Sequence, residues 1–295
     1  MKSRVKCEIL SDGRAFNFSR YMHFGKEKRF RLSLRMKLPP ADNEEKLREH
    51  YHALYRAWGP QHWWPGETQF EVIVGAYLTQ NTAWTNVERA LSNLRMAKVL
   101  SLEGIRGLKP AKLERLIRPS GYFRQKARRI KTFVAFLDQE YGGSLESFFS
   151  QPTGKIREQL LNLNGVGRET ADSILLYSGN HPVFVVDAYT RRVLDRHEIR
   201  AADADYDHIR QLFERALQPI VSEQIVNPLA SMPSIKSGFP QTAHPPSAMS
   251  MAKRADLVQI YNEMHGLIVG VGKHFCGKSQ PKCDGCPLQL FLPRR

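Results

Sequence analysis

The fold is decided by Leu163-Asn-Gly-Val-Gly-Arg-Glu-Thr-Ala171, which places two glycines between two apolar helical patterns. Apolar residues recur at helical spacing in Thr153–Leu161 before this stretch and in Ser173–Tyr177 after it. Gly165 and Gly167 permit positive φ values and the close approach of another backbone, so a tight turn is expected between the helices. The free N–H groups at the start of the second helix then face any arriving anion, such as a phosphate. A short G-x-G also fits an ordinary glycine turn, so the neighbouring sequence must decide.

A lone carboxylate follows further along the chain. Gly179 can end the second helix as a left-handed cap, and the apolar run Val183–Val186 then leads to Asp187. A helical pattern with Val193 and Leu194 begins directly after Asp187, which makes this residue a natural N-cap. The β-branched run is too isolated to found a sheet. Capping alone explains Asp187, and only its combination with the upstream glycine turn indicates more.

Together these residues resemble the helix-hairpin-helix DNA glycosylases of the endonuclease III superfamily, in which L-x-G-V-G precedes V-D at this distance. The resemblance implies an all-α fold of two helical domains with a DNA-binding cleft between them. It also implies that the hairpin N–H groups hold a phosphate of the damaged strand and that Asp187 is the essential carboxylate. Bifunctional members carry a lysine two residues after the second hairpin glycine, where this chain has Glu169. The resemblance therefore implies a monofunctional glycosylase that uses water and leaves an abasic site.

Further segments narrow the resemblance to the branch that excises 3-methyladenine. His62-Trp-Trp-Pro65, Phe70–Thr82 and Pro119–Ala127 are similar to stretches of that branch, with W-W-P and L-T-Q-N-T at the same spacing. The base pocket that the resemblance implies consists of Trp63, Trp64, Pro65, Trp84 and Glu169. The DNA contacts that it implies are Gln80, Asn81, Asn164, Gly165, Gly167, Arg168 and Thr170.

Aromatic residues suit the substrate of this branch. An N3-alkylated adenine is positively charged, and each aromatic face attracts a cation by about 0.5 to 2 kcal/mol. We expect Trp84, one helical turn after Gln80, to project from the same face of one helix. Trp63 and Trp64 are adjacent and cannot both face inward from a regular helix, so at least one is expected to line a cavity or the surface. Trp58 is expected in the core.

Asp187 is expected to act electrostatically. A cationic base is already a good leaving group, so the enzyme must chiefly stabilise the positive charge that develops on the sugar. Asp187 would do this and would also orient or deprotonate water. Gln80 and Asn81 are expected where polar side chains fill the space left by a flipped nucleotide, although Asn81 also suits simple turn chemistry.

The composition favours a nucleic-acid partner. The 295 residues hold 44 Lys or Arg against 29 Asp or Glu, a formal net charge of +15 with a pI near 9.8, which promotes salt-sensitive attraction to phosphate. Residues 1–37 contain eleven Lys or Arg and three acidic residues. Three alternatives stay open for this arm: it binds the DNA backbone, it is disordered, or it has no role. No long apolar run is present, so neither a signal peptide nor a transmembrane helix is expected. We predict a monomer in the cytoplasm, associated with the nucleoid, whose partner is double-stranded DNA with damaged bases and not a membrane.

The expected organisation combines helical domains with three other segments. These parts are a basic N-terminal arm (1–40), a helical domain that carries Asp187 (41–65 with 181–275), a six-helix domain (66–180) ending in the hairpin (153–179), an insertion loop with five prolines (226–249) and a Cys-containing loop (276–295). Amphipathic patterns predict further helices at Glu44–Arg56, Phe70–Leu78, Thr85–Leu94, Ala111–Leu116, Gln125–Gln139, Tyr206–Leu217 and Ala255–Val271.

Three cysteines near the C-terminus raise the question of a metal. Cys276, Cys283 and Cys286 form C-x6-C-x2-C, which resembles the first three ligands of the family's iron–sulfur pattern, but Leu292 occupies the place of the fourth. A [4Fe–4S] cluster normally uses four thiolates. With three cysteines, the alternatives are that another ligand completes the coordination, that the cluster is labile, or that it has been lost. A zinc site with His274 is possible by ligand type. The remaining alternative is three reduced thiols in a vestigial motif.

Three functional hypotheses remain open. The first is the monofunctional glycosylase for alkylated purines, with 3-methyladenine favoured over 7-methylguanine only by the resemblance. The second is a bifunctional endonuclease III-like glycosylase and abasic lyase for oxidised pyrimidines, against which Glu169 argues. The third is a noncatalytic helix-hairpin-helix protein that binds DNA, for which neither Asp187 nor the tryptophan-rich segment is needed.

Overall fold

The computed structural model describes residues 42–200, 202–222 and 240–293, and every regular element within them is helical. The predicted all-α class is confirmed for this part of the chain. The predicted basic arm (1–40) and residues 226–239 of the predicted insertion lie outside the described residues. Val183–Val186 is extended and buried, and it pairs with no strand in the described part.

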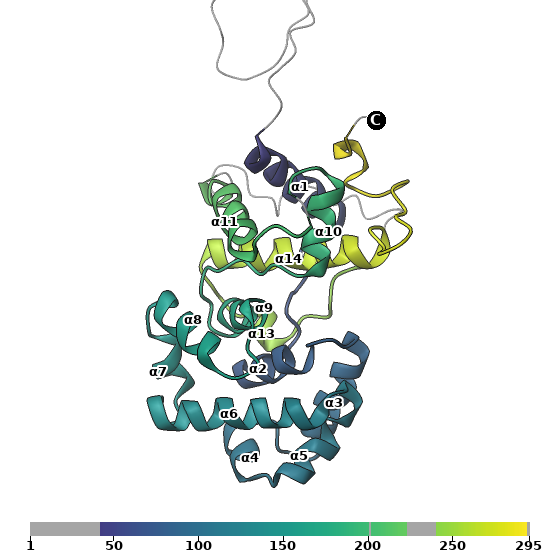
Figure 1. The fold of residues 1–295 in the computed structure, drawn as a ribbon. Coiled ribbons are helices and arrows are strands. Elements are labelled where there is room, and N and C mark those ends of the chain that lie inside the picture. Colours follow the sequence, from purple (N-terminus) through teal and green to yellow (C-terminus); the bar gives the residue numbers. More distant parts are fainter. Residues whose placement is uncertain (1–41, 201, 223–239, 294–295) are drawn as a thin grey trace, which may run out of the picture. The chain divides into compact units, whose positions relative to one another are not determined.

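One group of helices shares an apolar core around the long helix α6 (Phe123–Tyr141), which lies beneath α2 in Figure 1. Its inward face carries Ile130, Phe133 and Leu137 at helical spacing, and Gly142 ends it in the left-handed conformation with φ 59°. The other elements of the group are α2 (Gln69–Leu78), α3 (Trp84–Met96), α4 (Leu102–Gly107), α5 (Pro110–Leu116), η1 (Arg118–Ser120), α7 (Leu145–Phe149), α8 (Thr153–Asn162) and α9 (Arg168–Ser173).

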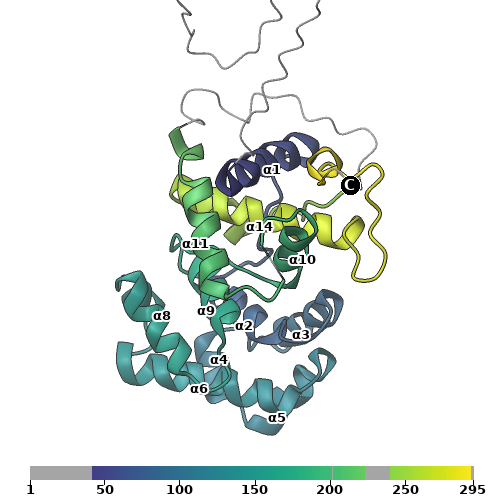
Figure 2. The ribbon, with the colours of Figure 1, turned by 45° about the horizontal axis from the view of Figure 1, so that its top comes forward.

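A second apolar core is built around α14 (Asp256–His274). Figures 1 and 2 show α1 (Asn43–Trp58), α10 (Ala188–Arg196) and α11 (Tyr206–Leu217) gathered around this helix, with α10 and α11 crossing it. Most of its residues are buried, because neighbours cover it on several sides. The short elements α13 (Ala248–Met251) and η4 (Gln289–Phe291) precede and follow α14 in the chain.

The second hairpin helix continues from α9 into a π-helical turn, η2 (Ile174–Ser178). The predicted left-handed cap at Gly179 is wrong, because Gly179 has φ −90° while Asn180 adopts φ 54°. The wider turn is closed by the Gly179 N–H, which donates to the carbonyl oxygen of Ile174 at 3.1 Å. Glycine is needed here for space, since a Cβ at this position would lie 2.5 Å from the Phe149 ring.

Candidate active site

The hairpin turn joins α8 to α9 through Leu163–Gly167. Gly165 has φ 79°, and a Cβ there would meet the Arg129 guanidinium at 1.9 Å, so both its conformation and its surroundings require glycine. Gly167 is different from the prediction: its φ is −92°, and a Cβ would have no neighbour within 4 Å. Gly167 occupies the N-cap position of α9, which leaves the N–H groups of the first turn of α9 free of backbone partners.

Gln80 holds the hairpin in place from the turn between α2 and α3. Its Nε2 donates to the carbonyl oxygen of Gly165 at 3.1 Å and to Thr170 Oγ1 at 2.9 Å, and its Oε1 accepts from Arg129 Nη1 at 2.5 Å. The prediction that Gln80 and Trp84 share one helix face is wrong, because α2 ends at residue 78 and α3 begins at residue 84. The neighbouring Asn81 is exposed with φ 53°, which is turn geometry.

Two further hairpin residues were predicted to contact DNA. Asn164 is exposed in the turn. Arg168 is also exposed, and its guanidinium pairs with Asp205 at 2.8 Å and with Asp207 at 3.3 Å. A phosphate at this point would have to compete with those carboxylates for the guanidinium.

Asp187 lies between the buried extended run and α10, where it forms the predicted N-cap. Its Oδ1 accepts from the Thr190 N–H at 2.7 Å and from Thr190 Oγ1 at 2.9 Å. Its Oδ2 faces the ring of His265 on α14, with 3.6 Å between Oδ2 and Nε2. The side chain keeps 13% of its surface exposed, so the carboxylate is fixed by its helix and still accessible.

Glu169 brings a second carboxyl group close to the first. Glu169 is exposed, yet desolvation by the neighbouring protein, and then the negative charge of Asp187, raise the pKa of Glu169 to about 7. A lysine at this position would be the amine of a bifunctional enzyme, whereas this chain supplies a group that gains or loses a proton near neutral pH.

Trp63 and Trp64 are both buried, so neither reaches the surface, and the alternative that one of them lines a cavity stays a prediction. They lie with Pro65 in the irregular segment between α1 and α2, where no helical period constrains their directions. Trp64 contacts the half-buried Trp84 edge-to-face with 5.1 Å between ring centroids, and its ring centroid lies 5.0 Å from that of Tyr177. Trp58 is buried and stacks on the Phe275 ring, which confirms its place in the core.

His244, which belongs to the predicted insertion, packs against the aromatic segment formed by Trp63, Trp64 and Trp84. No sequence pattern indicated this contact. Its ring lies 5.1 Å from that of Trp63 and 6.5 Å from that of Trp84, measured between centroids. The His244 N–H donates to the carbonyl oxygen of Gln61 at 3.0 Å, and Thr242 Oγ1 donates to Gln61 Oε1 at 2.6 Å. These hydrogen bonds hold residues 240–249 against the aromatic segment. The sequence could not predict the position of His244, because about 180 residues separate it from Gln61 along the chain.

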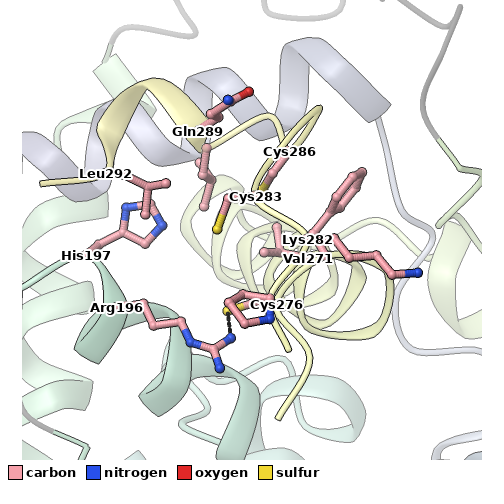
Figure 3. A pocket seen from close by; sticks show the side chains of 12 residues that line it. Arg196, His197, Val271, Cys276, Lys282, Cys283, Cys286, Gln289 and Leu292 are labelled. Atoms are coloured by element: carbon pink, nitrogen blue, oxygen red, sulfur yellow. Dashed lines mark hydrogen bonds between the residues drawn. The ribbon is translucent and has the colours of Figure 1, made fainter. Parts of the chain in front are cut away.

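The three C-terminal cysteines line one cavity, which Figure 3 shows with their thiols directed toward its interior. Arg196 Nη1 donates a hydrogen bond to Cys276 Sγ at 3.0 Å. Burial, and then the nearby sulfur atoms of Cys276 and Cys283, raise the pKa of Cys286 to about 11. Leu292 lines the same cavity and brings no donor atom.

The donor set of this cavity can be tested against the two metal hypotheses. Within the described ranges no group of three His, Cys, Asp or Glu side chains converges on a single ion, and His274 does not line the cavity, which argues against the zinc arrangement. The three thiols surrounding a shared space fit three of the four ligands of a [4Fe–4S] cluster. A bound cluster stays a prediction.

Comparison with known proteins places this geometry in a family. Residues 74–219 match the HhH-GPD superfamily base excision DNA repair protein family. A protein of Methanocaldococcus jannaschii whose name describes a DNA repair glycosylase is 40% identical over 242 residues, which cover 82% of this chain and 93% of that protein. Endonuclease III of Thermotoga maritima is 24% identical over 220 residues, covering 75% of this chain and 80% of its own.

Solved structures agree with this placement. The 3-methyladenine DNA glycosylase of H. pylori, bound to 1,N6-ethenoadenine, matches with a TM-score of 0.60 and 29% identity over 79% of this chain and 98% of that one. A trapped endonuclease III–DNA covalent intermediate shares the fold with a TM-score of 0.57 and 19% identity, covering 83% of this chain and 92% of that one. The chain belongs to the HhH-GPD superfamily of base excision DNA repair proteins, and it is a DNA glycosylase, a hydrolase that acts on N-glycosyl bonds.

Proposed function

We propose that this glycosylase is monofunctional and that it releases positively charged alkylated purines, above all 3-methyladenine, from duplex DNA. The observation that carries the proposal is that Glu169, whose carboxyl group feels the charge of Asp187, stands at the position where a lyase would need an amine. The cluster of aromatic rings formed by Trp64, Trp84 and His244 supports the proposal, because aromatic rings attract a cationic base. The similarity to the H. pylori 3-methyladenine glycosylase points to the same substrate class.

The mechanism follows from the geometry of Asp187. The hairpin and its free N–H groups would hold a phosphate beside the lesion while the damaged nucleotide leaves the stack, at a cost of a few kcal/mol. As the bond to the base lengthens, the ionised Asp187 carboxylate stabilises the positive charge on the sugar. The same carboxylate orients the water that attacks the sugar, and no covalent bond to the protein forms.

We also propose that the partner is double-stranded DNA with damaged bases, and that the protein acts on it as a monomer in the cytoplasm at the nucleoid. The net charge of +15 supports attraction to DNA. Among the described residues, no helix combines the length and the apolar character needed to cross a membrane.

The test is a single-turnover incubation with methylated duplex DNA, in which released bases and strand breaks before alkali are measured separately. Release of 3-methyladenine from strands that stay intact until alkali is the expected result. Strand scission without alkali, together with a borohydride-trapped adduct, would instead establish a lyase. Lys273 is then the first residue to replace, because its Nζ lies 5.9 Å from the centroid of the Trp63 ring and burial lowers its pKa.

A bound iron–sulfur cluster is part of the proposal. Cys276, Cys283 and Cys286 would hold it, and the Arg196 guanidinium would donate a hydrogen bond to one of its thiolates. When bound, the cluster would cross-link the end of α14 to the C-terminal loop, and base release would take place without it.

A further inference from the structure

His265 is a buried histidine whose ring reaches the catalytic carboxylate. It lies on α14 with 4% of its surface exposed, and its Nε2 is 3.6 Å from Asp187 Oδ2. Within the described part of the chain, Nε2 has no hydrogen-bond partner. A buried polar atom without a partner is unfavourable, so a partner in the working state is expected.

Tyr177 and Asp187 face the two ring nitrogens of His265, Tyr177 at Nδ1 and Asp187 at Nε2. The Tyr177 hydroxyl lies 2.7 Å from His265 Nδ1, and burial raises the pKa of Tyr177 well above its usual value, so the hydroxyl is protonated and is able to donate to Nδ1. Burial lowers the pKa of His265, and the Asp187 carboxylate only partly offsets this effect, so the ring is neutral at pH 7. A neutral imidazole that accepts at Nδ1 carries its hydrogen on Nε2. This tautomer places the hydrogen on the nitrogen that lies 3.6 Å from Asp187 Oδ2, where the negative carboxylate favours it.

The two oxygens of Asp187 have different surroundings. Oδ1 accepts both hydrogen bonds from Thr190, whereas no hydrogen bond from the described residues reaches Oδ2. Hydrogen bonds in catalytic sites are often long before the substrate binds, and a movement of a few tenths of an ångström would bring Nε2 within range. A neutral donor would fix Oδ2 without cancelling the negative charge, which an imidazolium would do.

We propose that His265 is a positioning residue that orients the Asp187 carboxylate through Nε2–H, with its tautomer set by Tyr177. This inference rests on the proposed function, since it assumes that Asp187 stabilises the developing sugar cation. The other groups that face this pair are the apolar rings of Trp63 and Phe184 beside His265, and the carboxyl group of Glu169, which interacts with Asp187 from α9.

The test compares His265→Phe, His265→Gln and Tyr177→Phe in the full chain by single-turnover base release and by affinity for lesion-containing DNA. Losing one hydrogen bond to a charged group predicts a release rate lower by about tenfold to a hundredfold in His265→Phe, with the DNA affinity unchanged. His265→Gln keeps an N–H donor and recovers part of the rate, and Tyr177→Phe shows a smaller loss. His50→Phe is the matched control, because it removes a buried histidine that has no contact with Asp187.

The pH profile separates positioning from a merely structural role. Without the donor, the acidic limb of the rate profile of His265→Phe moves to higher pH. Profiles recorded again with Glu169→Gln present exclude the second carboxyl group as the cause. A wild-type rate and profile in His265→Phe would overturn the proposal, and so would a loss of rate that follows thermal stability, leaves the acidic limb in place and is not rescued by glutamine.

The tautomer can be measured without any substrate. Histidine ¹⁵N NMR of the full chain is expected to show His265 neutral and protonated at Nε2, and to show this state disturbed in Tyr177→Phe. An Nδ1-protonated or charged ring would overturn the inference whatever the activity. If the wild-type protein released no alkylated base while the NMR result held, the proposed function would fail and the geometric inference would stand.

Discussion

Asp187 uses one oxygen for the fold and presents the other to the site. Because asparagine caps helices about as well as aspartate, Asp187→Asn keeps the hydrogen bonds to Thr190 and removes only the charge. We expect base release to fall by about a hundredfold or more, while lesion-DNA affinity and thermal stability stay near those of the wild type. Single-turnover kinetics and a binding isotherm measure the two effects. An active Asp187→Asn protein would remove this residue from the mechanism.

Glu169 predicts a pH dependence of its own. Its pKa, raised from 4.5 to about 7, makes the carboxyl group neutral in acid and negative above neutrality. The second charge strengthens the field that stabilises a cation, so base release should rise as the pH passes through about 7, and Glu169→Gln should flatten this rise.

The same shift predicts an effect of Glu169 on stability. The folded chain holds the Glu169 proton more tightly than the unfolded chain does, so the stabilisation is complete below pH 4.5 and is lost as the pH rises to about 7. Melting temperatures of wild type and Glu169→Gln should therefore diverge across this window, with the wild type losing more. Parallel curves would contradict the raised pKa.

At the level of single residues, the sequence predicted what depends on local chemistry. The cap at Asp187 followed from residue type and position, and the turn at Gly165 followed from the conformational freedom of glycine. The direction of Trp64 and the partners of Gln80 did not follow, because they depend on where α2 ends and on which distant backbone lies opposite. Periodicity arguments fail where a helix is interrupted, as it is between residues 78 and 84.

At the level of elements, the hairpin offers a matched pair of substitutions. Gly165→Ala places a Cβ at φ 79° and pushes the Arg129 side chain away from Gln80, which should destabilise the protein by about 1–3 kcal/mol. Gly167→Ala meets neither obstacle and should change the unfolding free energy by about 1 kcal/mol or less. Denaturant unfolding measures both. Equal loss of unfolding free energy in both variants would contradict the different surroundings of the two glycines. If Gly167→Ala is stable but binds DNA more weakly, a phosphate approaches Gly167 closely.

The C-terminal loop carries the prediction about the cluster. After anaerobic reconstitution, the wild-type protein should contain iron and sulfide in equal amounts, and Cys283→Ser should contain neither. Leu292→Cys supplies a fourth thiol to the same cavity and should make the cluster survive air longer. Iron bound by Leu292→Cys but not by the wild type would show that the motif is vestigial.

At the level of the whole molecule, the sequence was sufficient for the helical class and for most helix positions, because amphipathic periods are local. The association of helices into two apolar cores, with α14 packed on α1 and α10, was expected only from the resemblance to the family, because no local pattern links segments so far apart in the chain. The sequence also did not reveal that residues 240–249 join the aromatic cluster through His244. Packing partners of this kind are chosen by shape and volume, which a single sequence does not display.

The net charge yields a prediction for the whole chain. Residues 1–37, with eleven Lys or Arg and three acidic residues, contribute +8 of the total of +15, so roughly half of the charge lies in the arm. If the arm binds phosphates, deleting residues 1–40 should lower the affinity for undamaged duplex and reduce the slope of log K against log salt by about 0.9 for each phosphate that the arm neutralises. The single-turnover rate at saturating protein should stay the same, because Asp187 and the hairpin remain. An unchanged salt slope would show that the rest of the chain binds the DNA backbone, and a lower saturating rate would show that the arm acts in the chemical step.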